Sequence, residues 1–453
     1  MNLHKSDCHE NSNVILHAFD WAYSLVAERA ETISRLGYKT VLVSPPMKSY
    51  VCESGTQWWQ RYQPQDYRVI DNQLGNTKDF IHMVDTLKQH GLWVYVDVVF
   101  NHMANESGLR LDLQYPSSQD MLNYQNNAKQ YAELTLFGDL SQPLFDEKDF
   151  VEAFGITDWK DKWEVQNGRI SAGAHDPGLP TLRDSEHVVT QQKHYLMALK
   201  GLGVRGFRID AAKHMTLEHL AKVWVPEITD GMHIFGEIIT DGGATKEEYE
   251  LFLQPYLEQT KLAAYDFPLF NTIFKAFSKT GSLEYLVDPY SLGQALSNPR
   301  AITFTTTHDI PNNEVFIEHV MDEDMEWLAL AYVIGRDGGV PLIYADLDTS
   351  GITNKAGQPR WKDMWCDPKL AQLITFHKAV HGEPMTIVES CKNRLVIARG
   401  DKGTVVINKG QKKSRFTLNR PSGIELITSE SITKDNNEID VVVANASFAL
   451  ILH

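Results

Sequence analysis

Three acidic residues follow short apolar runs and could share one catalytic pocket. Asp210 ends the run GFRID, Glu237 ends HIFGE, and Asp309 follows AITFTTTH. A single acid at the end of a strand is more often a helix cap or an ion-pair partner. Three acids brought together repel one another, and burial adds a desolvation cost, so a fold keeps such a cluster where a raised pKa is useful. The trio therefore indicates catalysis.

Paired carboxylates without an evident cofactor loop are the groups that glycoside hydrolysis needs. One acid protonates the leaving oxygen, and the other attacks the anomeric carbon or activates water. The acid needs a raised pKa, whereas the nucleophile must stay ionised. Arg208 lies two positions before Asp210 on the same strand and points to the same side, so its guanidinium would keep Asp210 ionised. Glu237 is then left to carry the proton.

The elements that would position these acids alternate between strands and helices. Eight apolar runs with little alternation predict buried strands, namely residues 13–21, 38–46, 93–102, 206–212, 233–239, 262–268, 301–308 and 340–345. Helical patterns fill the intervals, at residues 22–36, 77–90, 188–201, 217–224, 245–258 and 324–334. Eight βα units predict an α/β fold with a (β/α)₈ barrel, whose active site lies at the carboxyl ends of the strands.

Two regions break this pattern. Residues 103–185 are polar and far longer than one crossover needs, so they predict a subdomain inserted after the third strand. Near the C-terminus, short alternating segments predict an antiparallel β-sandwich module, at residues 394–399, 404–408, 415–418, 424–428 and 439–452. We expect a barrel from residues 1–102 and 186–365, an insertion at 103–185, and a β domain at 366–453.

Composition excludes some classes of function. The 453 residues include 43 Lys and Arg against 59 Asp and Glu, which gives a formal net charge of −16. Nucleic-acid binding is not expected, because it needs clustered positive charge, and no apolar run is long enough to span a membrane. The first residues, MNLHKSD, lack the apolar region of a signal peptide. This favours the cytoplasm, with a mature secreted form as the alternative, and we expect a monomer.

Four segments of the sequence, in this order, resemble those that mark the α-amylase family of retaining glycoside hydrolases. They are DVVFNH at 97–102, GFRIDAAKH at 206–214, FGEI at 235–238 and THD at 307–309. The resemblance implies that Asp210 is the nucleophile and Glu237 the general acid/base. It implies that Asp309 is a third acid, which holds sugar hydroxyls in the oxocarbenium-like transition state.

The same resemblance implies a set of substrate-binding residues. His102 and His308 would hydrogen-bond the sugar in the −1 subsite, and Arg208 would lie beside the nucleophile. Lys213 and His214 would line the subsites on the leaving-group side. The loop WWQRYQP supplies the rest of the set, which is Tyr62 stacked on the −1 sugar, Trp58 and Trp59 at neighbouring subsites, and Gln63. Burial in the core is the alternative for the two Trp residues.

The family resemblance also implies a structural calcium ion between the barrel and the insertion. Asn101 would supply a side-chain ligand, His214 a backbone carbonyl, and Asp176 the carboxylate, in preference to Asp184. The expected acid is uncertain because Thr181 occupies the position of Asp in the family's LPDL stretch. No chloride requirement is expected, since Thr307 and Pro341 stand where chloride-binding members have an Asn and a basic residue.

The favoured function is an endo-acting α-1,4-glucan hydrolase, an α-amylase that cleaves starch, glycogen or maltooligosaccharides by retaining double displacement. A maltooligosaccharide-forming exo-amylase or a transglycosylase is the alternative, because subsite loops decide between them. A non-catalytic binding subunit is disfavoured because all three acids are present. A metal-dependent hydrolase using His102, His214 and His308 is also disfavoured, because the chain has no HxH or HExxH spacing.

Overall fold

Eight parallel strands close into a barrel, which confirms the predicted fold class. The computed structural model describes residues 13–453 apart from 53–54, 241–245, 420–424, 429–430 and 436–437. The strands follow one another around the barrel in chain order, and the last pairs with the first. They are β1 (Ile15–Ala18), β2 (Thr40–Val43), β7 (Trp93–Val99), β8 (Gly206–Asp210), β9 (His233–Gly236), β10 (Ala263–Tyr265), β11 (Ala301–Thr303) and β12 (Val340–Ala345).

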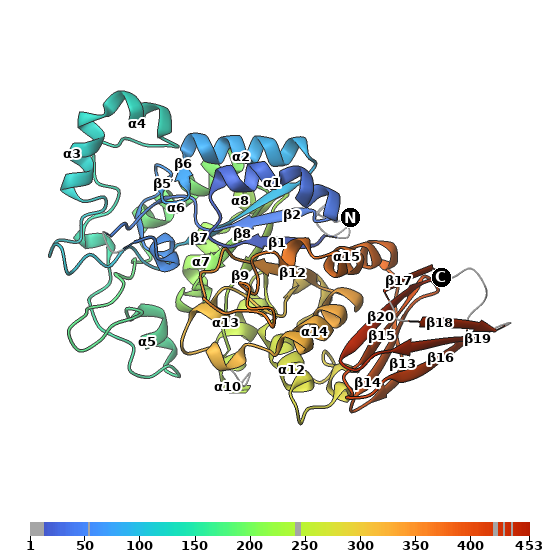
Figure 1. Ribbon diagram of the computed structural model, residues 1–453. Coiled ribbons are helices and arrows are strands. Elements are labelled where there is room, and N and C mark those ends of the chain that lie inside the picture. Colours follow the sequence, from blue (N-terminus) through green and yellow to red (C-terminus); the bar gives the residue numbers. More distant parts are fainter. Residues whose placement is uncertain (1–12, 53–54, 241–245, 420–424, 429–430, 436–437) are drawn as a thin grey trace, which may run out of the picture.

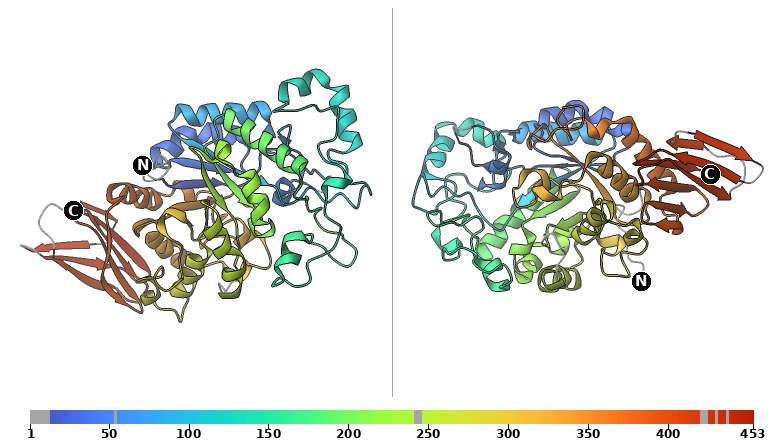
Figure 2. Two further views of the ribbon diagram at one scale, coloured as in Figure 1. Left: turned by 180° about the vertical axis from the view of Figure 1, so that it is seen from behind. Right: turned by 60° about the horizontal axis from the view of Figure 1, so that its bottom comes forward.

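Helices surround the barrel in Figures 1 and 2. Those that follow successive strands are α1 (Tyr23–Leu36), α2 (Thr77–Gln89), α6 (Glu186–Gly201), α7 (Leu217–Val223) with α8 (Pro226–Thr229), α11 (Gln254–Gln259), α12 (Phe267–Phe277), α14 (Glu323–Gly335) and α15 (Pro368–Val380). Local sequence sets their ends: Asn76 and Asp79 form a capping box at the start of α2. Gly37 ends α1 in the left-handed conformation at φ 99°.

The helix predicted for residues 245–258 is irregular. Residue 245 lies outside the described residues, and the rest forms α10 (Lys246–Glu248), a π-helical turn η5 (Tyr249–Leu253) and α11. Shorter 3₁₀ or α turns follow several strands at the carboxyl end of the barrel. They include η4 (Ala212–His214) and α13 (Asp309–Asn312). Four further 3₁₀ turns lie elsewhere in the loops, namely η6 (Leu283–Leu286), η7 (Asn298–Arg300), η8 (Ile317–His319) and η9 (Met364–Cys366).

Two long excursions leave the barrel. The first, between β2 and α2, contains β3 (Lys48–Ser49), η2 (Trp58–Tyr62), β4 (Pro64–Asp66), β5 (Asp71–Asn72) and β6 (Gly75–Asn76). The second, between β7 and α6, is the predicted insertion, with α3 (Ser118–Asn126), α4 (Ala128–Leu134), η3 (Glu147–Asp149) and α5 (Lys162–Asn167). Figure 1 shows these helices at one side of the barrel, with the red C-terminal strands at the opposite end.

The C-terminal strands form two antiparallel sheets that pack face to face. One sheet has the order β13–β14–β15–β20–β17 and the other β16–β19–β18. A core of seven apolar side chains from both sheets, including Val396, Phe416 and Val441, lies between them. The strands are β13 (Met385–Cys391), β14 (Arg394–Arg399), β15 (Gly403–Asn408), β16 (Ser414–Asn419), β17 (Glu425–Thr428), β18 (Ser431–Asp435), β19 (Glu438–Val443) and β20 (Ser447–Leu452).

Details of this module differ from the sequence expectation. The segment 439–452 is two strands, because the chain turns between them through Ala446 at φ 46°. Strands β13 and β18 were not expected, and residue 424 lies outside the described part of the chain. The region from 366 onward begins with a helix, α15, which follows β12 as an eighth barrel helix would.

Among the helices that the described residues form, none has the length and apolar character that a membrane crossing requires.

Candidate active site

The three acids lie together at the carboxyl ends of neighbouring strands. Asp210 is the last residue of β8, Glu237 comes directly after β9, and Asp309 opens the turn α13 after β11. Asp210 and Glu237 are buried, and Asp309 is half-buried. The chain turns sharply after Asp210, because Ala211 adopts the left-handed conformation at φ 48°, a region that non-glycine residues occupy mainly at functional sites. This turn directs the Ala211 N–H toward Oε2 of Glu237 at 3.3 Å.

Arg208 connects the acids through one guanidinium group. Its Nη1 lies 2.8 Å from Oδ1 of Asp210 and 2.7 Å from Oδ2 of Asp97. Its Nη2 donates to Oε1 of Glu237. Asp97 is wholly buried and also accepts from the hydroxyl of Tyr62 at 2.9 Å. Asp97 thus supports Arg208 from beneath the site, and Arg208 contacts both acids that the reaction would use.

Burial dominates the electrostatics of this cluster. Loss of solvent raises the pKa of Asp210 to about 7 and that of Glu237 to about 7, although Arg208 opposes both shifts. The same cause raises the pKa of Asp97 to about 8 and raises the pKa of Asp309. The expectation that Arg208 would distinguish Asp210 from Glu237 needs correction, because the guanidinium touches both.

Asp309 provides the distinction instead. A hydrogen bond between the carboxyls of Glu237 and Asp309 raises the pKa of Glu237 and lowers that of Asp309. Two carboxyl groups can hydrogen-bond only when one carries a proton, since an ionised carboxylate only accepts. That proton lies on Glu237 or on Asp309. Arg208 binds Asp210 and Glu237 alike, so the proton shared with Asp309, and not the guanidinium, sets Glu237 apart from Asp210.

Aromatic rings form a wall beside the acids. The ring of His308 stacks between Phe19 at 4.6 Å and Tyr62 at 5.1 Å, with interplanar angles of 19° and 15°. Trp58 meets this group edge-on, 5.7 Å from His308. Burial lowers the pKa of His308 to about 3, so its ring is neutral, and its buried Nδ1 has no protein partner among the described residues. That nitrogen is shielded from solvent by its neighbours.

The other predicted sugar-binding residues near this wall are bound to protein groups. Nε2 of His102 donates to the backbone carbonyl of Tyr62 at 3.0 Å. Oε1 of Gln63 accepts from the N–H of Asn105 at 3.0 Å. Trp59 turns away from Trp58 and stacks on Tyr50 at 6.1 Å, with 37% of its surface exposed. Trp58 is therefore the Trp that joins the acid site.

Lys213 and His214 lie where the insertion meets the barrel. Nζ of Lys213 pairs with Oε1 of Glu248 at 2.7 Å, and its main-chain N–H donates to the carbonyl of Glu237. Trp159, from the insertion, packs edge-on against His214 at 5.8 Å and is 45% exposed. An exposed aromatic ring thus stands beside the predicted leaving-group subsites.

The residues expected to hold calcium do not form a suitable donor set. Asp176 is exposed, and its Oδ1 accepts from Nδ2 of Asn105 at 2.6 Å and from the N–H of Gly178 at 2.9 Å. Asn101 is buried, with its amide nitrogen 3.4 Å from Nδ1 of His102. No group of three or more His, Cys, Asp and Glu side chains that could hold a metal occurs in the part of the chain described. Calcium takes carboxylate, amide and carbonyl oxygens, and Asp176, the one carboxylate of the expected set, is held at the surface by Asn105 and Gly178, so this set does not fit the ion.

Sequence reasoning missed residues on β1 and β12. Phe19 stacks on His308, and His17 lies 5.5 Å from His308 and 5.9 Å from Tyr344. Both nitrogens of His17 are buried without a partner among the described residues, and burial lowers its pKa well below the usual range. A usable signal was present, because these residues lie in the first and last strands and side chains there also face the site. Asp266, in contrast, caps α12 by accepting the N–H of Leu269.

Comparison with known proteins identifies the family. The family description "Alpha amylase, catalytic domain" matches residues 24–264, and an α-amylase of Aeromonas hydrophila is 46% identical over 90% of this chain and 86% of its own. This chain belongs to the α-amylase family. It is a glycoside hydrolase of that family, with the barrel and the segments that the family resemblance predicted.

Solved structures agree with this family at the level of fold. A mutant of α-amylase I from Eisenia fetida, in complex with maltohexaose, has a TM-score of 0.75 at 20% identity and covers 97% of both chains. Gamma-CGTase from alkalophilic Bacillus clarkii has a TM-score of 0.71 at 16% identity, over 98% of this chain and 70% of its own. Because hydrolases and glucanotransferases share this architecture, the fold alone does not choose between the two activities.

Proposed function

We propose that this α-amylase-family enzyme is an endo-acting α-1,4-glucan hydrolase that works by retaining double displacement. The observation that carries the proposal is the single Arg208 guanidinium bound to both Asp210 and Glu237. It holds two carboxyls side by side at one edge of the barrel, as glycoside cleavage requires. The named α-amylase relative and the maltohexaose bound to a protein of the same fold support a glucan substrate.

In the first step, Glu237 gives its proton to the glycosidic oxygen as the bond to the anomeric carbon breaks. Asp210 forms a covalent bond to that carbon, and the shortened glucan leaves as an alcohol. In the second step, Glu237 takes a proton from water, whose oxygen attacks the same carbon and releases Asp210. Asp309 and His308 would hold sugar hydroxyls as positive charge develops on the ring.

Exposed aromatic rings support action within long chains. Trp59 stacks on Tyr50 in the excursion after β2, and Trp159 stands in the insertion beside His214. Sugar faces are apolar and pack on such rings. Two segments far apart in sequence thus offer platforms for sugars beyond the one being cleaved, which suits an internal bond of a polymer better than a chain end.

Turnover by Glu237→Gln tests the assignment of the acid. The amide cannot donate the proton, so the rate on soluble starch should fall about 10²–10⁴-fold, the usual contribution of general acid catalysis. Binding of maltohexaose to the variant should persist, which shows that the site is intact. If the variant kept more than about a tenth of wild-type turnover, Glu237 would not be the acid.

A product time course distinguishes endo-hydrolysis from the alternatives. An endo-enzyme abolishes iodine staining of amylose while little reducing sugar has formed, whereas an exo-enzyme releases one short product from the start. A transglycosylase would convert maltohexaose partly into longer oligosaccharides. Asp210→Asn serves as the blank in each assay. Longer products, or iodine staining that falls only in proportion to reducing sugar, would contradict the endo-hydrolase proposal.

A further inference from the structure

The two barrel residues that resemble calcium ligands are hydrogen-bonded directly to the insertion. The carbonyl of Asn101 accepts the N–H of Leu182 at 2.9 Å. Nδ1 of His214 lies 2.9 Å from the carbonyl of Val165, and because a carbonyl oxygen only accepts, that nitrogen carries the hydrogen. Burial lowers the pKa of His214 to about 4, so the ring stays neutral at physiological pH. Each residue thus joins barrel to insertion directly, through atoms other than the expected ligand oxygens, which are the side-chain oxygen of Asn101 and the main-chain carbonyl of His214.

Thr181 makes a bond that an acid in its place could not make. Its hydroxyl is buried and donates to the carbonyl of Gly168 at 3.0 Å. A hydroxyl meets a carbonyl through its hydrogen, whereas an ionised carboxylate has only acceptor oxygens and needs a cation between itself and the carbonyl. The substitution of Thr for the family's Asp therefore replaces an arrangement that requires a cation with one that does not.

The two acids considered as calcium ligands make other contacts, and Oδ1 of Asp184 is buried without a partner among the described residues. Oδ1 of Asp176 accepts from Asn105 and Gly178 at the surface. Oδ2 of Asp184 pairs with Nζ of Lys222 on α7 at 2.9 Å. Neither carboxylate is held toward the Thr181 region by the contacts that it makes.

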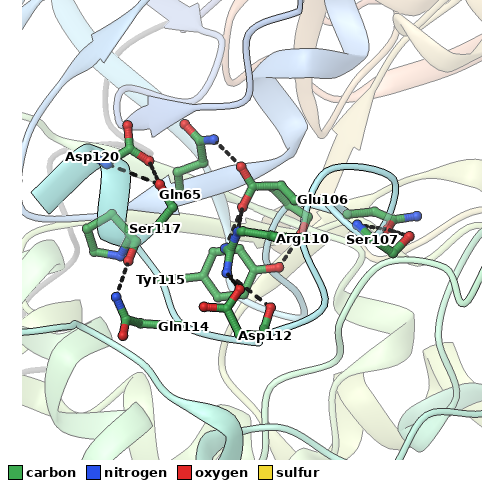
Figure 3. Close-up of polar contacts among 12 residues, drawn as sticks. Gln65, Glu106, Ser107, Arg110, Asp112, Gln114, Tyr115, Ser117 and Asp120 are labelled. Atoms are coloured by element: carbon green, nitrogen blue, oxygen red, sulfur yellow. Dashed lines mark hydrogen bonds and ion pairs between the residues drawn. The ribbon is translucent and has the colours of Figure 1, made fainter. Parts of the chain in front are cut away.

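The guanidinium of Arg110 supplies positive charge near the start of the insertion, where it pairs with Glu106. Figure 3 shows the carboxylate of Glu106 between Gln65 and Arg110, with Oε1 2.6 Å from Nε2 of Gln65 and Oε2 3.0 Å from Nε of Arg110. The guanidinium packs 4.6 Å over the ring of Tyr115, whose hydroxyl donates to the carbonyl of Ala104. Glu106 is buried, and Gln65 belongs to β4 of the barrel excursion. The ion pair lies within the insertion, and the hydrogen bond from Gln65 to Glu106 ties it to the barrel side.

We propose that this chain attaches its inserted subdomain to the barrel without a calcium ion. The Thr181–Gly168 hydrogen bond takes the place of an acid that would need a cation, and direct hydrogen bonds at Asn101, His214 and Glu106 join the insertion to the barrel side. The enzyme should then be indifferent to chelators, in contrast to what the family resemblance alone implies. The inference concerns how the fold is held and stands apart from the proposed endo-hydrolysis.

Thermal unfolding of the purified full-length protein tests the proposal. After dialysis against EDTA, the Tm should differ by less than about 1 °C from the Tm in millimolar CaCl₂, because only a ligand bound to the folded state raises it. Calcium titrated into the EDTA-treated, desalted protein should give no stoichiometric heat of binding. A Tm that falls by several degrees in EDTA and recovers with Ca²⁺ but not Mg²⁺ would overturn the proposal.

Arg110→Met tests the ion pair, and Lys78→Met is its matched control. Lys78 on α2 pairs with Glu133 of the insertion, so this pair spans the junction, but both side chains are more than half exposed. Arg110→Met should lower the Tm more than Lys78→Met and speed proteolysis within the insertion, in CaCl₂ and EDTA alike. Equal effects of the two substitutions, or rescue of Arg110→Met by calcium, would contradict the proposal. If Arg110→Met fails to fold, the wild-type chelation experiment still decides.

Thr181→Asp provides the converse test. It places a carboxylate against the Gly168 carbonyl and restores the acid of the family pattern. The variant should be less stable than wild type in EDTA and should gain Tm on addition of CaCl₂. A variant that ignores calcium would contradict the role given to Thr181.

Discussion

Glu237 combines two properties that oppose each other. Its proton serves the proposed chemistry, but burial beside Asp309 raises its pKa to about 7, so above that pH the folded protein holds an unfavourable charge. A carboxyl with a raised pKa in the folded state contributes stability that is present below its unfolded pKa and is lost as pH rises through the folded value. The site therefore weakens the fold at neutral and alkaline pH.

Glu237→Gln should consequently stabilise the protein in a pH-dependent way. The amide does not ionise, so the free energy of unfolding at pH 8 should rise by about 1–3 kcal/mol, given that one pKa unit is worth about 1.4 kcal/mol. At pH 4 the difference should nearly vanish, because the wild-type carboxyl is then protonated in the folded state. Urea unfolding of both proteins at several pH values measures this difference in the free energy of unfolding. A gain that is largest at low pH would contradict the pKa assignment.

At the scale of elements, η2 (Trp58–Tyr62) brings consecutive aromatic residues to different places. Trp58 contacts His308 and Tyr62, whereas Trp59 stacks on Tyr50 away from the acids. Trp58→Ala should lower kcat/KM on maltohexaose about tenfold, because an aromatic contact is worth about 0.5–1.5 kcal/mol beyond the area that it buries. Trp59→Ala is the control. It should change kcat/KM on maltohexaose less, and it should act mainly on KM for long chains. Equal losses in kcat would contradict this division.

The strands that carry the site could be predicted from sequence because each is apolar on both faces and ends in a polar residue. Asp210, Glu237 and Asp309 were placed by that rule alone. The role of Arg208 was only partly predictable, since alternation along β8 puts it beside Asp210 but cannot show that its other nitrogen reaches Glu237 on β9. His17 on β1 and Phe19 just after it were not predicted, because β1 carries no acidic residue that would mark it as part of the site.

At the scale of the whole molecule, the C-terminal module caps helices of the barrel. Lys409, after β15, donates to the carbonyls of Ala276 and Gly281 at the end of α12, each at 2.7 Å. Arg399 of β14 donates to the carbonyls of Gly335 at 2.8 Å and Val380 at 3.2 Å, which end α14 and α15. Terminal helix carbonyls lack partners within the helix, so these cations satisfy them. The pattern of short strands predicted the module. It could not predict these contacts, because a local pattern does not show which distant residues meet, and Lys409 lies more than a hundred positions from Ala276 and Gly281.

Arg399→Met tests this capping role. The buried carbonyls would lose their donors, so the protein should lose about 1–3 kcal/mol of stability while kcat on starch stays unchanged below the unfolding transition. Lys402→Met is the control, because the Lys402 side chain is exposed and pairs with Glu383 at 2.7 Å. A fall in kcat without a fall in Tm would show that the module acts on the site instead.

The most direct test of the central claim is the anomeric configuration of the first product, followed by proton NMR during cleavage of maltohexaose. Asp210 as nucleophile and Glu237 as acid/base imply two displacements, so the new reducing end should appear first as the α-anomer, with the β-anomer growing only by mutarotation. A product that appears first as the β-anomer would mean a single displacement by water and would contradict the account.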